Sequence, residues 1–237
     1  MPNYKRDFLT ERHDDYEDKF QDWHFHLLSY IGGQDYQNGY LLNRYVLETD
    51  EEYNKRQNNT PIDNHCKNVV QIYSSFLFRV PPTRNYGTLS GDEQLENFLK
   101  DADLDGRSFD NIIREMQINA SIYGTCWAIM DKPAVQTETR AEEIQLDIRP
   151  YLSIYTPENV LNWNYQRMIN GRYELTSLTL LENLSNDVAT IRVWTKEDIT
   201  TVMVKDFSKG YSTSNPILID EMPNMIGEIP AITLYNQ

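Results

Sequence analysis

Apolar residues recur at helical spacing through the first half of the chain. From residue 15 to residue 31 an apolar side chain returns every three or four positions, which predicts a long helix. Gly32 and Gly33 follow it, and glycine commonly ends a helix. We interpret residues 33–40 as a loop. A second apolar set at Leu42, Tyr45 and Val46 predicts another helix over residues 41–53, and the acidic, Asn-rich stretch through Thr60 is interpreted as solvated surface.

The clearest helical pattern covers residues 62–80 and ends at two prolines. Eight apolar residues keep to one face for more than four turns: Ile62, Cys66, Val69, Val70, Tyr73, Phe76, Leu77 and Val80. Pro81 and Pro82 then end the helix, because proline lacks the N–H that would continue it. Asp63 in the first turn suits the helix dipole. We expect this face, including Cys66, to pack in the core.

Three further elements follow around the middle of the chain. Residues 88–91 read as a turn-rich connection and residues 93–100 as a short helix. Ser108 is a suitable N-cap for a helix whose apolar stripe runs to residue 123, and Gly124 can end it in the left-handed conformation. Residues 125–130 form a continuous apolar run that predicts a buried strand, and Pro133 follows it.

Beyond Pro133 the pattern changes from helices to strands. Residues 134–143 are polar and are interpreted as a loop. The predicted strands are residues 150–155, 160–167, 173–182, 190–194, 199–204, 217–220 and 229–234. Asn170-Gly171 predicts a tight hairpin turn, and Asn215-Pro216 sets off a later strand. The sequence therefore predicts an α+β fold, with a helical part over residues 1–124 and a mostly antiparallel, β-rich part over residues 125–237.

Composition limits the classes of protein to which the chain can belong. It has 237 residues, of which 40% are hydrophobic, enough to build a core. The net charge of −14 argues against a protein that binds nucleic acid by neutralising phosphates. The negative charge is compatible with a protein that lets DNA slide past without binding it tightly. We find no apolar run long enough to span a membrane, and the polar first twenty residues do not resemble a secretory signal.

Few side chains form a recognisable chemical motif. Asp101, Asp103 and Asp105 match the first half of a calcium-binding EF-hand loop, but its twelfth position falls on Ile112 instead of a glutamate. We favour a loop whose aspartates bond their own backbone, and we expect no bound metal or cofactor. Cys66 and Cys126 are too few for a metal cluster or a disulfide framework, and we expect both to be buried free thiols.

Catalytic motifs give no support for an enzyme. The chain lacks a Gly-x-Ser-x-Gly elbow, a phosphate-binding Gly-x-x-x-x-Gly-Lys loop and a His-Glu-x-x-His zinc helix. A hydrolase that uses two carboxylates stays open as an alternative, although no pair of acidic residues stands apart from the surface charge. We therefore expect no enzymatic activity.

Six short motifs follow one another along the chain: YIGG (30–33), FLFRVPP (76–82), DLDGRS (103–108), YGTCWAIMDKP (123–133), RPYLSIY (149–155) and ENVLNW (158–163). In this order they resemble the portal proteins of tailed bacteriophages, the head–tail connectors in which a helical region precedes a β-rich wing. Together they lie in the region of the chain from residue 30 to residue 234. The resemblance implies a homo-oligomeric ring, commonly a dodecamer, at one capsid vertex of the virion.

The resemblance also implies the partners of such a ring. Double-stranded DNA passes through it during packaging by the terminase motor and during ejection, without sequence-specific binding and without a membrane. The major capsid protein and a head–tail adaptor are its other expected partners, and assembly is expected in the host cytoplasm. An acidic chain suits this channel, because a wall that held phosphate tightly would stall the DNA.

One departure from the family pattern concerns the end of the chain. Portal proteins of this kind continue into stem helices and a clip, and we expect neither within these residues, so the 237 residues read as an N-terminal wing-type region. We predict intersubunit packing through helix faces and exposed tyrosines. Arg79, Arg149 and Trp163 are the candidates for an interface or a buried network. Another virion structural or adaptor protein is the alternative function.

Overall fold

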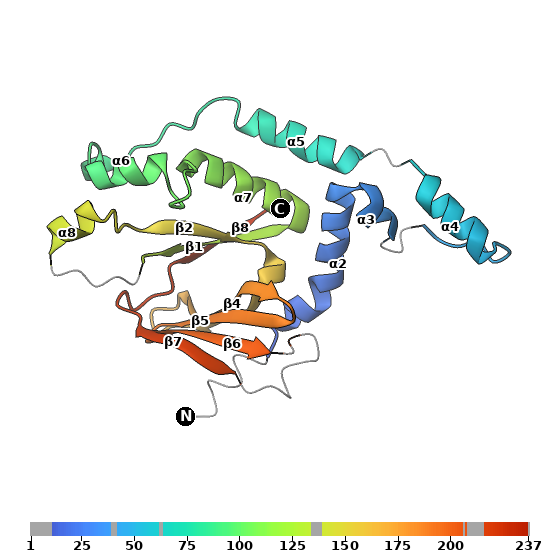
Figure 1. Cartoon of the computed structure of the whole chain (residues 1–237). Helices are drawn as coiled ribbons and strands as arrows, with labels where there is room; N and C mark the ends of the chain where they lie inside the picture. The colour runs from blue at the N-terminus through green and yellow to red at the C-terminus, as the bar shows by residue number, and fades with distance from the viewer. Residues whose placement is uncertain are drawn as a thin grey trace. The chain divides into compact units, whose positions relative to one another are not determined.

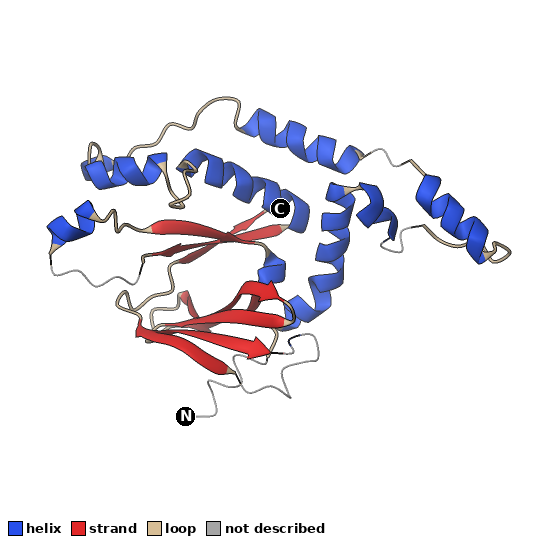
Figure 2. Ribbon diagram, viewed as in Figure 1, coloured by secondary structure: helices blue, strands red, loops and turns tan. Residues whose placement is uncertain are grey.

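The computed structural model describes residues 11–38, 42–61, 64–133, 139–205, 207 and 216–236. The chain forms two compact units: residues 1–20 with 155–232, and residues 21–154 with 233–237. We call these the sheet unit and the helical unit (Figure 1). Helices predominate in the first half and strands in the second (Figure 2), so the predicted α+β class is confirmed. None of the helices among the described residues is long and apolar enough to cross a membrane.

The helical unit contains most of the helices and a three-stranded sheet. Its elements, with α2 beginning in the sheet unit, are α2 (Asp14–Ile31), α3 (Gly33–Asn38), α4 (Asp50–Asn59), α5 (His65–Leu77), η1 (Gly87–Leu89), α6 (Glu93–Lys100), α7 (Phe109–Tyr123), β1 (Thr125–Asp131), α8 (Arg140–Gln145), β2 (Tyr151–Tyr155) and β8 (Ala231–Tyr235). The strand order is β2-β1-β8. The last strand of the chain thus joins a sheet whose other members lie about a hundred residues earlier.

Helix α7 is the centre of the core of the helical unit. Ser108 caps it by accepting a hydrogen bond from Asn111 N, and Gly124 ends it at φ 83°. Its stripe packs with β1 and β2 in a cluster of buried residues: Ala102, Ile112, Met116, Ala120, Cys126, Ala128 and Leu152. The predicted cap, stripe, stop and following strand are all confirmed, and Cys126 is buried as expected.

The sheet unit is a five-stranded antiparallel meander in which every strand pairs with its neighbour in sequence. The strands are β3 (Val160–Arg167), β4 (Tyr173–Ser185), β5 (Val188–Thr195), β6 (Asp198–Lys205) and β7 (Ile217–Pro223), preceded by the short η2 (Pro157–Asn159). Its buried side chains include Leu178, Leu180, Ile191 and Trp194. The predicted hairpins at Asn170-Gly171 and between residues 194 and 199 are confirmed. Asn215 lies outside the described residues.

Three predicted elements differ from those observed. Residues 33–38 form helix α3 and not a loop, and part of the expected polar loop at 134–143 is helix α8, capped by Thr139. The helix expected over residues 41–53 begins only at Asp50, because Thr49 and Glu52 form a capping box there. Helix α4 therefore occupies the predicted solvated stretch, and it does lack buried residues.

Helix α5 forms where it was predicted, but its environment differs. It is capped by Asn64, whose side chain accepts a hydrogen bond from Lys67 N and donates one to Tyr30 O at 2.6 Å. Ile62 and Asp63 lie outside the described residues. The apolar face is exposed, and so is Cys66, so the predictions of a core face and of a buried Cys66 thiol are wrong. The helix meets α7 through its other side, where Ser74 is buried.

Candidate interaction surface

Arg149, which lies just before β2, forms hydrogen bonds with the loop at residues 101–106, which we call the acidic loop. Its guanidinium donates to the backbone O of Asp101 and, at 2.6 Å, to the carboxylate of the same residue; Nε reaches Asp147 at 3.0 Å. The side chain is 11% exposed. Leu152 N also donates to Ala102 O at 2.7 Å. The Arg149 side chain is therefore mostly buried inside the helical unit, whereas its partners Asp101 and Asp147 are 30% and 68% exposed.

The aspartates of the acidic loop bond the backbone of that loop. Asp103 accepts from Asp105 N and Arg107 N, each at 3.0 Å, and Asp101 accepts from Gly106 N at 2.8 Å. Burial alone would raise the pKa of Asp103, but the Arg107 side chain and these N–H groups outweigh burial and lower the pKa to about 2. Among the described residues, no group of three potential ligands could hold a metal ion.

Trp163 belongs to the sheet unit and stacks on a residue from the start of the chain. The rings of His13 and Trp163 are 3.9 Å apart and nearly parallel, at 11°. His13 N donates to Leu161 O on the same strand, and the Tyr16 hydroxyl donates to Glu158 O at 3.0 Å. These contacts hold residues 13–16 against β3 and the preceding η2. Trp163 is therefore half-buried within its own unit.

Arg79 lies just beyond the end of α5 and is exposed. It lines an open hollow together with Asn68, Gln71, Ile72, Ser75 and Phe76. Arg79, Arg149 and Trp163 thus occupy three separate places and do not form one site. Of the three, Arg79 borders a surface that can receive another molecule.

That surface is the outward face of α5. Val69, Ile72, Tyr73 and Phe76 are 65%, 57%, 57% and 69% exposed, and we call these four residues the α5 face. Their spacing places them on one side of the helix. Leu77 and Val80 extend the apolar surface at the helix end, with 53% and 72% exposure.

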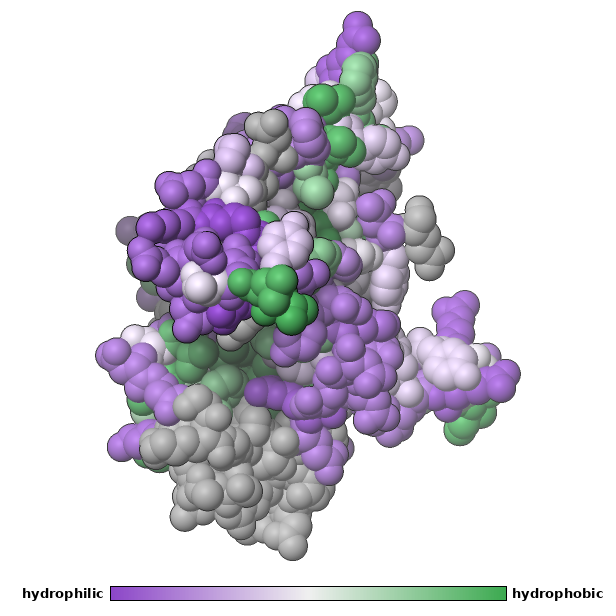
Figure 3. All heavy atoms as spheres, turned by 90° about the vertical axis from the view of Figure 1, so that its right-hand side faces the viewer, coloured by the Kyte–Doolittle hydropathy of each residue, from purple (hydrophilic) through white to green (hydrophobic). Residues whose placement is uncertain are grey.

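A second apolar surface precedes α4, and the sequence pattern assigned it wrongly to a helix. Tyr45, Val46 and Leu47 are 70%, 99% and 95% exposed; we call these three residues the tip. Figure 3 views the molecule from the side of α4 and shows hydrophobic surface, in green, between hydrophilic groups. The sequence did contain a signal for the true start of the helix, namely the capping box formed by Thr49 and Glu52. This capping box places residues 45–47 before the helix.

The described features are those of a protein that assembles with other chains. The chain has a net charge of −14 and exposes two apolar surfaces, whereas the polar clusters described above are ion pairs and backbone contacts within the chain. Large exposed apolar surfaces commonly mark protein–protein contacts. The two surfaces therefore define a class of protein that offers apolar contact sites to other chains.

A family model described as phage portal protein, SPP1 Gp6-like, matches residues 26–237. Because the match covers most of the chain, the chain belongs to this family of phage portal proteins. The family is structural and not enzymatic, and its members are components of the virion. Membership implies an oligomeric ring that acts with the capsid and with DNA. No curated protein sequence matches this chain.

Proposed function

We propose that these residues are the wing-type region of a portal subunit, with a helical part over residues 1–124 and a β-rich part over residues 125–237. About twelve copies form a ring at one capsid vertex, and the ring is part of the conduit for packaging and ejection of double-stranded DNA. The stem and clip of the family lie outside this region. No cofactor takes part.

The partners follow from the position of such a ring. The terminase motor delivers DNA to it, the major capsid protein surrounds it, and a head–tail adaptor attaches to it after packaging. The acidic composition supports passage of DNA without tight binding, because the chain as a whole repels phosphate. Assembly takes place in the host cytoplasm.

The exposed α5 face is the structural observation that carries the proposal. The residues Tyr73 and Phe76 together expose roughly 250 Å². With Val69 and Ile72, the face reaches the size at which apolar patches on soluble proteins usually mark interaction sites. A ring subunit has such surfaces because each copy contacts two neighbours.

The test is the mass and shape of the product of the complete reading frame, measured by light scattering and negative-stain imaging. We expect a ring of about twelve copies with a central hole. A compact monomer or dimer would contradict the proposal and would favour the adaptor alternative. Assembly into particles gives a second readout, since a portal occupies one vertex, whereas another virion subunit would be present in a different copy number.

A further inference from the structure

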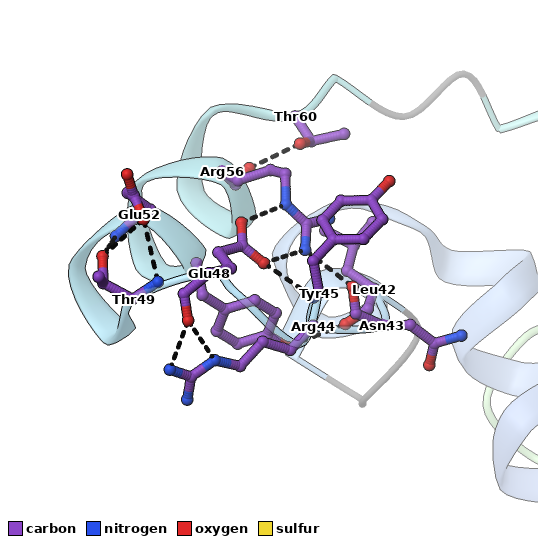
Figure 4. Close-up of polar contacts among 10 residues, drawn as sticks. Leu42, Asn43, Arg44, Tyr45, Glu48, Thr49, Glu52, Arg56 and Thr60 are labelled. Carbon is purple, nitrogen blue, oxygen red and sulfur yellow. Dashed lines mark hydrogen bonds and ion pairs between the residues drawn. The ribbon is translucent and has the colours of Figure 1, made fainter.

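Residues 42–61, which we call the arm, are held together by a polar network centred on Glu48 and Arg56 (Figure 4). The two side chains make a bidentate pair, with both N–O distances at 2.8 Å. Arg56 also donates to Asn43 O at 2.8 Å, and Arg44 donates twice to Glu48 O. The hydrogen bonds from Arg56 lower the pKa of Glu48 to about 2, which keeps this carboxylate charged at neutral pH.

This network fixes the tip although the tip has little core beneath it. Tyr45 N donates to the Glu48 carboxylate at 3.2 Å, and the Arg56 guanidinium lies 5.0 Å from the centre of the Tyr45 ring. The Tyr53 hydroxyl donates to Leu42 O at 3.0 Å, which closes the start of the arm onto α4. Val46 and Leu47 are therefore presented to solvent by a preorganised turn, and preorganisation lowers the entropic cost of binding.

The base of the arm is attached to α3 at the opposite end of α4. Gln57 Nε2 donates to Gln37 O at 2.9 Å, and the Gln37 side chain donates to Thr60 O. The ten residues of α4 span about 15 Å between this base and the tip. The residues of the tip and of the α5 face are all more than half exposed, so neither surface covers the other within one copy. The tip and the α5 face of one copy are thus separate surfaces.

The two surfaces complement each other in polarity and charge. Both have apolar centres with an aromatic residue. Asp50 and Glu51 border the tip, and their side chains are 85% and 79% exposed. Asp50 pairs with Arg44 and Glu51 with Lys55, and such exposed ion pairs are weak enough for the carboxylates to exchange partners. Arg79 borders the α5 face, and its guanidinium forms no ion pair with the part of the chain that the structure describes. An apolar tip with a carboxylate rim fits an apolar face with a guanidinium at its edge.

We infer that the tip of one copy docks on the α5 face of the neighbouring copy, so that the arm links successive subunits of the ring. This inference rests on the proposed ring. A closed ring of more than two copies needs two different surfaces that fit each other, and a surface that fits only itself gives a dimer. The tip and the α5 face are such a pair.

Cross-linking tests the pairing in the full-length protein. In a Cys66→Ser background, one version carries Val46→Cys and another carries Ile72→Cys, and the two are co-expressed and treated with a short bis-maleimide. We expect covalent dimers from the mixed rings and none from rings of either version alone. Dimers from Ile72→Cys alone would mean that α5 faces pack on each other, and would overturn the inference.

The remaining outcomes separate this inference from the ring itself. Intact rings without cross-links would overturn the tip contact and leave the proposed function standing. Failure of the unmodified protein to form rings would overturn both. A charge in the tip gives an independent measurement: Val46→Asp is expected to weaken ring assembly by roughly tenfold or more, because it places a carboxylate in an apolar contact.

Ile169→Asp is the matched control, since Ile169 is as fully exposed as Val46 but lies in the hairpin turn before β4. We expect it to leave assembly unchanged, and both variants should keep the thermal midpoint of the unmodified chain. If Val46→Asp formed normal rings that failed only to enter capsids, the tip would bind another virion protein and the inference would be wrong.

Discussion

The five-stranded sheet and helix α5 use the same kinds of residue in opposite ways. Leu178, Leu180 and Ile191 of the sheet are fully buried, whereas Phe76 and Ile72 of α5 are 69% and 57% exposed. Both segments have regular apolar periodicity. The comparison shows that an amphipathic pattern identifies an apolar face but does not tell whether the rest of the same chain buries that face.

The largest expected effect is a loss of stability when a buried side chain of the sheet is truncated. Leu180→Ala removes a fully buried side chain from β4 and should lower the free energy of unfolding by about 2–5 kcal/mol, because it leaves a cavity. Urea denaturation followed by circular dichroism measures it. Leu184→Ala on the same strand is the control, since Leu184 is 51% exposed and should change stability by less than about 0.5 kcal/mol. Equal effects would show that β4 is not buried as described.

A smaller loss is expected from the polar network of the helical unit. Arg149→Ala removes three charge-assisted contacts to Asp101 and Asp147 and should cost about 1.5–3 kcal/mol. Arg79→Ala is its control, an exposed arginine that should cost less than about 0.5 kcal/mol in the unassembled chain. An unchanged urea midpoint for Arg149→Ala would contradict a structural role for this residue.

The acidic loop should make stability depend on pH. The pKa of Asp103 is about 2 in the folded chain and higher in the unfolded chain, so its contribution is complete above the unfolded value and is lost as pH falls towards 2. We expect a contribution on the order of 1–2 kcal/mol, reduced by solvent around the half-exposed Arg107. Unfolding measured between pH 7 and pH 2 should show this loss, and Asp103→Asn should diminish it. A pH profile unaffected by that variant would disprove the assignment.

The smallest effect on stability is expected on the exposed α5 face, and it tests most directly whether this face differs from the buried sheet. Phe76→Ala removes an aromatic side chain from the exposed α5 face, and the unassembled chain should change by less than about 0.5 kcal/mol. Ring assembly should nevertheless weaken, because aromatic residues often dominate interface energy. Sedimentation of the full-length protein measures assembly, and urea denaturation measures folding. A destabilisation as large as that of Leu180→Ala would mean that the α5 face is part of the folded core.

Local signals determined much of the fold. The Ser108 cap, the stripe of α7 and the stop at Gly124 specify a helix whatever surrounds it, and the Asn170-Gly171 turn specifies the β3–β4 hairpin. These elements depend on interactions between residues close in sequence, which a pattern records. The six portal-like motifs likewise indicated the family from sequence alone, and the family match confirms it.

Only the tertiary structure decided where the apolar faces lie. The periodicity of α5 is that of a core helix, but α7 meets its Ser74 side, so the apolar residues point outward. The tip carries apolar residues that the pattern assigned to a helix, and the Glu48–Arg56 pair holds them in a turn. Burial and side-chain pairing depend on which segments meet in space, and a one-dimensional pattern contains no record of that choice.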